Sequence, residues 1–448
     1  MIRIDQLRVD GFKPINKLEI EPRRLNIITG RNNSGKTSLL ESIDILFNPG
    51  SIADFGSNIN YLINSDSDEC EIEVVYSRGQ KTLSEFVPGG SDGRRRQLHI
   101  REPTDGEVID YFYKSIYDIL DLNQGYPISP SPLDDAEIDD GDAVSNIIDK
   151  VLRDEVSNLT EGDLLTSGAA ENIVVVQIDE NEYPFIHLGD YYDRIREQIV
   201  LAAKTKLMRK IENEFQDSKL NQLLRNQQSP RTADELLNRS LGRLLAPRFG
   251  RTRFVNEVPD SVEGIEFIRD VNGDPTQFDL NKENAAIRIQ KIEEYLKNNI
   301  MDGLQDFSFD KIVIQDEYDK DPYEVPYAFL GEGVKIIVRI LWSLLDEDNE
   351  GSVLLLEEPE NHMHPGYVAN FSKTLVDIAE KNNIQIYMTT HNTDLINSFF
   401  SPQIGKERQS FLNKNFRLIQ LTNPVSKIMG YKECRTKKEE LDLDLRGV

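Results

Sequence analysis

Cysteine is scarce in this sequence of 448 residues, because only Cys70 and Cys434 occur and they lie far apart. A disulfide framework or a thiolate metal site needs more cysteines than this, so neither is expected. Long apolar runs are also missing, since the two strongest, residues 173–176 and 336–345, are short and Arg339 interrupts the second. A bilayer needs about 20 apolar residues, so no membrane segment is expected. The chain opens with charged residues rather than a secretory signal, which predicts a cytoplasmic protein.

Positive charge is in short supply as well. The chain has 52 Lys and Arg residues against 78 Asp and Glu residues, and its net charge is −26. Such an acidic surface does not attract DNA as a whole, so direct DNA binding would need a local basic patch. Residues 94–96 and the basic group at 204–210 are candidates, although ordinary solvated faces are the simpler interpretation. The acidic stretch 134–142 is interpreted as a surface insertion, because its spacing does not match a calcium loop.

The sequence does contain a phosphate-binding loop. Residues 30–37, Gly-Arg-Asn-Asn-Ser-Gly-Lys-Thr, match the pattern G-x-x-x-x-G-K-[ST] at every fixed position. Residues 25–29 before it read as a short buried strand, and residues 38–47 after it carry apolar side chains at helical spacing. This strand–loop–helix context favours a nucleotide site over a chance glycine-rich turn.

The residue types of the loop predict its chemistry. Gly30 and Gly35 allow the backbone to wrap closely around a phosphate, and the following helix adds its positive end. Lys36 would reach the β- and γ-phosphates of ATP, and the Thr37 hydroxyl would bind Mg²⁺. The residues expected to contact ATP are Gly30, Asn32, Asn33, Ser34, Gly35, Lys36, Thr37 and Ser38.

A second motif supplies carboxylates. Residues 353–360, Val-Leu-Leu-Leu-Glu-Glu-Pro-Glu, read as a buried strand that ends in acids. Beside a phosphate loop, Glu357 would bind the metal and Glu358 would be the general base that orients water. A strand that runs into an acidic loop would explain either acid alone, but it does not easily explain the pair.

Histidine is rare, and His391 directly follows the predicted strand 384–390. Ligands bind at the carboxyl ends of strands in open α/β sheets, so His391 would sense or stabilise the γ-phosphate. A structural histidine is the alternative, and the position after the acidic strand disfavours it. His362 and His364 could suggest a metal, but no further His or Cys cluster accompanies them. The expected catalytic residues are Lys36, Glu358 and His391.

The remaining pattern predicts an α/β protein. Alternating apolar residues predict two strands around a turn near Pro14. Strands at 70–76, 81–87, 97–101 and 108–113 would form an antiparallel sheet beside the nucleotide site. Further strands are expected at 173–178, 311–316 and 416–421, and helices at 191–226, 232–246, 280–302 and 334–345. Residues 1–114 and 301–448 are expected to be two parts of one nucleotide-binding head, and residues 115–300 an insertion with an acidic loop followed mostly by helix.

The order of these motifs resembles a known family. The phosphate loop is followed by Phe-Leu-Gly-Glu-Gly at 329–333, by the glutamate strand with Asn-His-Met-His-Pro at 361–365, and by Thr-Thr-His-Asn at 389–392. This series resembles the ATPase heads of the ABC class, above all the SMC-like and OLD-family (overcoming lysogenization defect) ATPases of bacteria. The resemblance implies a P-loop NTPase of the ABC type with a mixed central sheet, an accessory antiparallel sheet and a helical insertion.

The same resemblance implies a composite site. Two heads of a homodimer or higher homo-oligomer would sandwich two ATP molecules. One subunit would provide the phosphate loop, Glu358 and His391, and the other would provide Gly331 and Gly333. These glycines open a predicted helix whose N-terminus can face the γ-phosphate. Gly331 stands where a serine of the ABC signature usually contacts phosphate, and Glu357 replaces the more usual aspartate, so the site differs in detail from the common pattern.

The end of the chain bears on the biological role that the resemblance implies. OLD-family nucleases carry a Toprim nuclease domain of about 100 residues after the ATPase, whereas 57 residues, 392–448, follow His391 here. Asp442 and Asp444 are therefore interpreted as part of a surface tail. The chain resembles stand-alone ATPase subunits of bacterial anti-phage defence such as Septu or PARIS, which implies control of a separate effector, a nuclease. An SMC-like DNA-repair or chromosome-maintenance ATPase that binds DNA directly, and a self-contained nuclease, are the alternatives.

Overall fold

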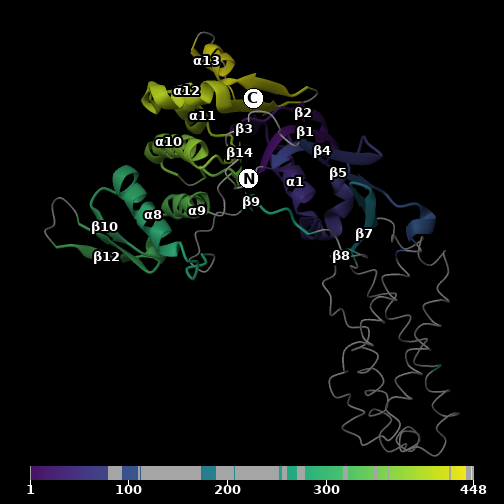
Figure 1. Cartoon of the computed structure of the whole chain (residues 1–448), viewed down its shortest axis with the longest axis horizontal. Coiled ribbons are helices and arrows are strands. Elements are labelled where there is room, and N and C mark those ends of the chain that lie inside the picture. The colour runs from purple at the N-terminus through teal and green to yellow at the C-terminus, as the bar shows by residue number, and fades with distance from the viewer. Residues whose placement is uncertain are drawn as a thin grey trace, which may run out of the picture. The chain divides into compact units, whose positions relative to one another are not determined.

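The computed structural model of the chain describes residues 2–78, 93–108, 111, 173–187, 206, 252–254, 260–269, 278–315, 321–346, 351–361, 363–422, 425–439 and 445 (Figure 1). The chain forms two compact units. The first comprises Met1–Pro49, Asn64–Leu98 and Asp260–Val448, and the second Gly50–Ile63 and His99–Pro259. Several predictions fall outside the described residues: the strand 81–87, the acidic stretch 134–142, the helices 191–226 and 232–246 apart from the helical Lys206, and His362, Asp442 and Asp444.

The first unit is built on a six-stranded sheet of order β16–β15–β3–β14–β13–β9. Its strands are β3 (Leu25–Gly30), β9 (Ile265–Ile268), β13 (Val353–Glu357), β14 (Gln385–Thr389), β15 (Phe416–Leu421) and β16 (Lys427–Gly430). Neighbours run parallel except β15 and β16, so the sheet is mixed, as predicted. The inner strands are continuous runs of buried residues, as is typical of parallel strands with both faces covered. The carboxyl ends of β3, β13 and β14 therefore meet at one edge.

Helix α1 (Lys36–Phe47) lies between this sheet and an antiparallel sheet, and nearly all of its residues are buried (Figure 1). In this unit the antiparallel sheet contains β1 (Ile2–Phe12), β2 (Ile15–Ile20), β4 (Glu69–Arg78) and the start of β5 (Gly93–Arg101), in the order β2–β1–β4–β5. The buried Gln385 ties the two sheets together. Its amide accepts a hydrogen bond from Ile4 N (2.8 Å) and donates one to Ile4 O (2.9 Å).

Aromatic side chains and one buried ion pair stabilise the part of the first unit that contains α9. Helices α8 (Ala285–Asn299) and α9 (Glu332–Leu344) pack beside a small antiparallel sheet of β10 (Leu304–Phe307), β11 (Lys311–Ile314) and β12 (Tyr323–Pro326), and the turn η4 (Tyr327–Phe329) leads into α9. Phe278 and Phe309 stack at 4.3 Å, and both meet Trp342 edge-on. The buried Arg288 lies 3.8 Å over the Trp342 ring and pairs with Asp346 at 2.9 Å. These contacts give α9 a rigid base.

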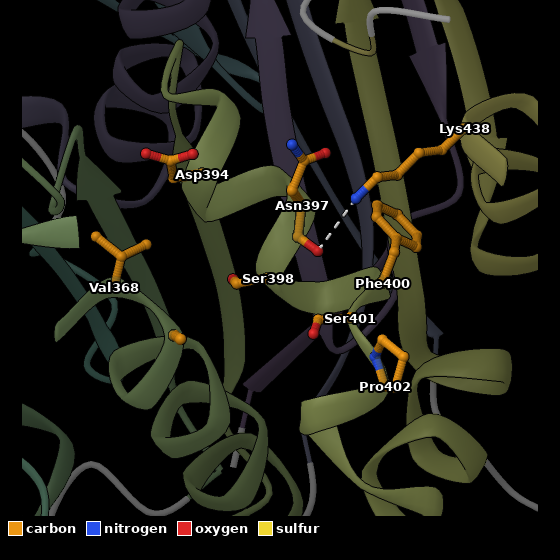
Figure 2. A pocket seen from close by; sticks show the side chains of 9 residues that line it. Val368, Asp394, Asn397, Ser398, Phe400, Ser401, Pro402 and Lys438 are labelled. Atoms are coloured by element: carbon orange, nitrogen blue, oxygen red, sulfur yellow. Dashed lines mark hydrogen bonds between the residues drawn. The ribbon is translucent and has the colours of Figure 1, made fainter. Parts of the chain in front are cut away.

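The remaining helices of the first unit are α10 (Pro365–Lys381), α11 (Thr393–Phe400), η6 (Pro402–Ile404), α12 (Lys406–Asn415) and α13 (Tyr431–Glu439). A cavity of about 580 Å³ lies beside α11 (Figure 2). Asp394, Phe400 and Lys438 are among the residues that line it, and Lys438 Nζ donates to Asn397 O at 3.5 Å. None of the residues predicted to contact ATP lines this cavity. Within the described ranges, no helix has both the length and the apolar composition that crossing a membrane requires.

Leu445 is part of the core rather than of a surface tail. It is buried, and its carbonyl accepts hydrogen bonds from Thr29 Oγ1 (3.1 Å) and Gln420 Nε2 (3.2 Å). Thr29 lies in β3, next to Gly30 of the phosphate loop. The surface-tail interpretation therefore does not extend to Leu445.

The second unit contains the antiparallel strands β6 (Ile173–Ile178), β7 (Asn181–His187) and β8 (Thr252–Phe254). All but the first residue of the 3-10 stretch η1 (Pro49–Leu62) belong to it as well. The strand predicted at 108–113 is wrong, because Val108 and Tyr111 are helical. Thr104 N donates to the Glu107 carboxylate (2.8 Å), and Glu107 N donates to Thr104 Oγ1 (3.4 Å). This reciprocal pair is a capping box, a helix-start signal that outweighs the β-branched and aromatic residues after it.

Candidate functional site

At two positions, Gly30 and Gly35, the phosphate loop has a backbone conformation and close neighbours that favour glycine. Gly30 and Gly35 have φ values of 151° and 96°. A Cβ on Gly30 would lie 2.5 Å from the carbonyl oxygen of Leu421, and a Cβ on Gly35 would lie 2.9 Å from Ile15 Cγ1. The turn between β1 and β2 thus packs directly on the loop. Both glycines are required by close approach as well as by backbone conformation.

The side chains of the loop divide into exposed and buried groups. Asn32 and Asn33 are exposed, whereas Lys36 and Ser38 are buried. Lys36 Nζ donates to the backbone carbonyl oxygens of Gly30 (3.3 Å) and Arg31 (3.2 Å), so its charge is held at the mouth of the loop. The buried hydroxyl of Ser34 has no hydrogen-bond partner among the described residues.

Thr37 connects the phosphate loop to the acidic strand. Its hydroxyl donates a hydrogen bond to Glu357 Oε1, so the two residues predicted to bind Mg²⁺ lie in contact. A hydroxyl and a carboxylate are hard oxygen ligands of the kind Mg²⁺ prefers. Within the described ranges, no group of three or more His, Cys, Asp or Glu side chains is arranged to hold a metal. His364 instead caps α10, because its Nδ1 accepts a hydrogen bond from Gly366 N at 3.1 Å.

Glu358 and His391 meet at the same edge of the sheet. Beyond the last register pair of β13 and β14, Glu358 N donates to Thr389 Oγ1 (3.1 Å), and Glu358 Oε1 lies 2.9 Å from His391 Nδ1. Asn361 Nδ2 donates to Glu358 Oε2 at 3.1 Å. The φ of Glu358 is 42°, a conformation that costs a residue with a side chain on the order of 1 kcal/mol. Strain of this kind at a site of converging polar groups is typical of a functional position.

The contact between Glu358 and His391 determines which ring nitrogen carries hydrogen. An ionised carboxylate can only accept hydrogen bonds, so His391 Nδ1 must be the donor. In the neutral ring, Nε2 then remains as an acceptor. The imidazole is half exposed, and Nε2 can meet a ligand from solvent.

Sequence reasoning missed the side chains that hold this arrangement. Thr389 accepts from Glu358 N, and Thr390 Oγ1 donates to the buried carboxylate of Glu360. The adjacent threonines before His391 were a usable signal, because threonines at strand ends often bond neighbouring backbone. Their partners depend on the pairing of β13 with β14, which no local pattern specifies.

Gly331 and Gly333 stand apart from this cluster. They lie at the start of α9, and an added Cβ on Gly331 would meet no atom of the described residues within 4 Å. Phe329, just before them, is 81% exposed although Tyr327 and Leu330 are buried. Within the described ranges, no hydrogen bond or ion pair joins residues 329–333 to the phosphate loop. The structure thus brings together the residues predicted for one subunit. Of those predicted for the other, Gly331 is exposed and Gly333 is buried.

The predicted basic patch at 94–96 is partly neutralised. Arg95 pairs with Glu73 at 2.6 Å on the neighbouring strand. The neighbouring Gln97 donates to Glu71. Ion pairs of this kind reduce the positive field that a DNA backbone would meet.

The parallel strands, the loop after β3 and the acids after β13 define a P-loop NTPase. The family described as "AAA domain, putative AbiEii toxin, Type IV TA system" matches residues 25–397, and the chain belongs to this family.

Individual relatives match shorter parts. A 124-residue segment is 31% identical to an uncharacterized protein of Methanocaldococcus jannaschii, covering 26% of this chain and 100% of that protein. A 73-residue segment is 38% identical to the Septu protein PtuA of Bacillus thuringiensis, covering 16% of this chain and 17% of that protein. Among solved structures, the Smc head domain of Pyrococcus furiosus, bound to the C-terminal domain of ScpA, matches with a TM-score of 0.40 and 15% identity over 99% of this chain and 100% of that one.

Proposed function

We propose that this chain is an ABC-type, OLD-like ATPase that hydrolyses ATP with Mg²⁺ at sites shared between two copies. The observation that carries the proposal is the presence of two bonded pairs at one sheet edge. Thr37 bonds Glu357, and Glu358 bonds His391. The first pair offers oxygen ligands for a divalent cation, and the second offers a base with an orienting partner.

The residues of the site fit ATP and Mg²⁺. The loop holds a buried hydroxyl, Ser34, that has no partner in the described part of the chain, and it lacks a Cβ at two positions of close approach, Gly30 and Gly35. Such loops cradle phosphate through backbone N–H groups. Thr37 and Glu357 would hold Mg²⁺, which when bound supplies charge neutralisation for the phosphate oxygens.

The side chains then act through contacts already in place. Lys36 Nζ exchanges its two carbonyl partners for phosphate oxygens, which attract its charge more strongly. Glu358 accepts a proton from water, while Asn361 and His391 fix the direction of its carboxylate. His391 Nε2 donates toward the γ-phosphate once the ring is protonated.

A second copy of the chain completes the site in this proposal. The start of α9 offers backbone N–H groups at Gly331 and Gly333, beside an exposed aromatic ring, Phe329. Helix N-termini bind anions, and aromatic side chains are common anchors at interfaces. Both features are unpartnered within the described ranges, which suits a contact that forms only when ATP is bound.

The proposed biological role rests on the similarity to the Septu protein. The 73-residue match covers 17% of that protein, so the support for a defence role comes from one short segment. We propose that the dimer controls a separate effector, a nuclease, in the cytoplasm of a bacterium under phage attack. A nuclease that co-purifies with the ATP-bound dimer, and is released on hydrolysis, is the expected partner. Salt-sensitive DNA binding by the purified chain alone would instead favour an SMC-like role.

Two variants and a control test the ATPase itself. Glu358→Gln should bind ATP normally but hydrolyse it at least about 100-fold more slowly, because the base is lost. Lys36→Ala should lose ATP binding, measured with a fluorescent ATP analogue. Glu380→Gln makes the same chemical change on an exposed position of α10 and should leave both properties unchanged. Full turnover by Glu358→Gln would refute the assigned base, and full turnover by isolated monomers would refute the shared site.

A further inference from the structure

The loops after β13 and β14 are joined by three successive side-chain links. The parallel register ends with Glu357 opposite Thr389. Beyond it, the backbone of residue 358 bonds the hydroxyl of Thr389, the carboxylate of residue 358 bonds His391, and the carboxylate of Glu360 bonds the hydroxyl of Thr390. Side chains thus continue the strand pairing beyond the ends of β13 and β14. Thr390 lies between Thr389 and His391, and its bond to Glu360 is buried.

Glu360 is an unusual core residue. Its side chain is 3% exposed, Oε1 accepts from Thr390 Oγ1, and Oε2 is buried without a hydrogen-bond partner among the described residues. Burial raises the pKa of its carboxyl to about 7, although the Thr390 hydrogen bond opposes the rise. An apolar residue would fill this place at lower cost, so the carboxyl is expected to have a task.

Thr390 transmits the constraint to His391. While it donates to Glu360, its hydroxyl oxygen also accepts from Asn392 N at 3.0 Å. Asn392 in turn caps α11 by accepting from Asp394 N (2.7 Å) and Leu395 N (3.2 Å). The residues on both sides of His391 are therefore fixed, one to the glutamate loop and one to a helix.

We propose that Glu360 and Thr390 are a positioning pair that holds His391 Nδ1 against Glu358. The proposal rests on the proposed ATPase function for its consequence in catalysis, but the geometry it describes exists without nucleotide. Without the pair, the His391 loop would move relative to the glutamate loop, and the ring would lose its fixed hydrogen bond. A displacement near 1 Å at such a site slows turnover by about 100-fold.

Four variants separate the bond from the size of the side chains. Thr390→Val and Glu360→Ala remove it, whereas Thr390→Ser and Glu360→Gln keep a hydroxyl donor and an acceptor oxygen. Thr374→Val is the control for the same chemical change, because Thr374 Oγ1 also donates a hydrogen bond, to the backbone oxygen of Asn370 (3.0 Å) within α10. Each variant is first checked for folding by thermal unfolding.

Two readouts follow, one kinetic and one free of nucleotide. The ATP turnover number should fall about 10- to 100-fold in Thr390→Val and Glu360→Ala, with ATP affinity within about twofold of the parent, and it should be retained in Thr390→Ser, Glu360→Gln and Thr374→Val. In the protein without nucleotide, ¹⁵N spectra of labelled histidine, assigned with His391→Gln, should show a single Nδ1–H tautomer in the parent and a tautomer mixture in the two bond-breaking variants.

The outcomes are distinct. If Thr390→Val and Glu360→Ala keep both the single tautomer and the parent turnover, the positioning pair is refuted. The parent protein could show the single tautomer, and the variants that break the Glu360–Thr390 bond could lose it, while the parent hydrolyses no ATP. This result would refute the proposed ATPase and leave the positioning pair standing. Equal kinetic losses in Thr390→Val and Thr374→Val would mean general loosening of the fold and would also overturn the proposal.

Discussion

The phosphate-loop edge and the start of α9 carry equally clear glycine motifs but have opposite surroundings. Gly30 and Gly35 are enclosed so tightly that a Cβ would lie 2.5 Å from Leu421 O and 2.9 Å from Ile15 Cγ1. Gly331, in contrast, has no atom of the described chain within 4 Å of that position. Lys36, Thr37, Glu358 and the ring of His391 are all hydrogen-bonded, while Phe329 is exposed.

This contrast shows what each glycine is for. At Gly35 the positive φ and the packing of the β1–β2 turn require glycine inside one copy of the chain. Gly331 has φ −61°, which any residue adopts, so its backbone conformation does not demand glycine, and no atom of the described residues would crowd a side chain there. In the proposed dimer, the second copy of the chain would supply the requirement for a small residue.

The largest expected effect comes from filling that open place. Gly331→Arg should leave the thermal midpoint unchanged, because its side chain meets open space, and should lower ATP turnover about 100-fold by blocking the partner. Mixing it with Lys36→Ala sharpens the comparison, because a mixed dimer holds one site with both defects and one with neither. Recovery of turnover, measured as phosphate release, is expected on mixing. No recovery would contradict the shared site.

The pH dependence of stability probes the loops beside the phosphate-loop edge. Since the folded pKa of Glu360 is about 7 against an ordinary 4.5, the folded protein keeps a proton that the unfolded chain releases. The stability from this group is full below pH 4.5 and is lost as pH rises through 7, a change of about 3 kcal/mol. Glu360→Gln cannot titrate.

Urea unfolding of parent and Glu360→Gln at pH 5 and pH 8 measures this change. Relative to the parent, the free energy of unfolding of the variant should rise by about 2–3 kcal/mol from pH 5 to pH 8, because part of the change already occurs below pH 5. The difference between the two proteins removes the contribution of all other titrating groups. A constant difference would show that the carboxyl titrates normally.

Gly35→Ala tests the enclosed glycine. The added Cβ combines a φ of 96° with a 2.9 Å approach to Ile15, so a loss of about 1–3 kcal/mol of stability is expected. The matched change at the open site, Gly331→Ala, should cost less than about 0.5 kcal/mol. Chemical denaturation of the two variants side by side measures the difference in their free energies of unfolding. Equal losses of stability would contradict the contrast between the two glycines.

Phe329→Ser should have the smallest effect. Removing an exposed ring leaves the fold intact, and it should weaken ATP-dependent dimerisation of the Glu358→Gln protein by about 1–2 kcal/mol, or roughly tenfold in dissociation constant. Sedimentation with and without ATP measures this, and Tyr61→Ser, another exposed ring, is the control. If Phe329→Ser and Tyr61→Ser dimerise equally well, Phe329 is not part of the dimer interface.

Local patterns were sufficient for much of this site. The phosphate loop, Glu357, Glu358 and His391 could be placed because each follows a short apolar strand, and parallel strands deliver their carboxyl ends to one edge. The accessory sheet was predicted from strand-like segments, of which 70–76 and 97–101 lie in β4 and β5, and the mixed central sheet was predicted from the family resemblance. The strand at 108–113 was wrong because the capping box at Thr104 and Glu107 was overlooked.

What sequence could not provide depends on contacts between distant segments. The Glu360–Thr390 bond needs the register of β13 against β14, and the burial of Gly35 needs the turn at Ile15. Leu445 shows the same limit, because its carbonyl reaches Thr29 across nearly the whole chain. Motifs indicate which residues are present, and the partners of those residues follow only from the fold.

The position of β3 has a consequence for how the protein is made. Its neighbours in the sheet are β14 and β15, and Asn26 bonds Ile386 at a separation of 360 residues. A ribosome adds about 5–20 residues each second, so the loop leaves the ribosome tens of seconds before its supporting strands exist. A nascent chain therefore carries the complete motif while it is unable to form the site. If the loop binds nucleotide as proposed, binding is expected only after synthesis has passed residue 421, where β15 ends.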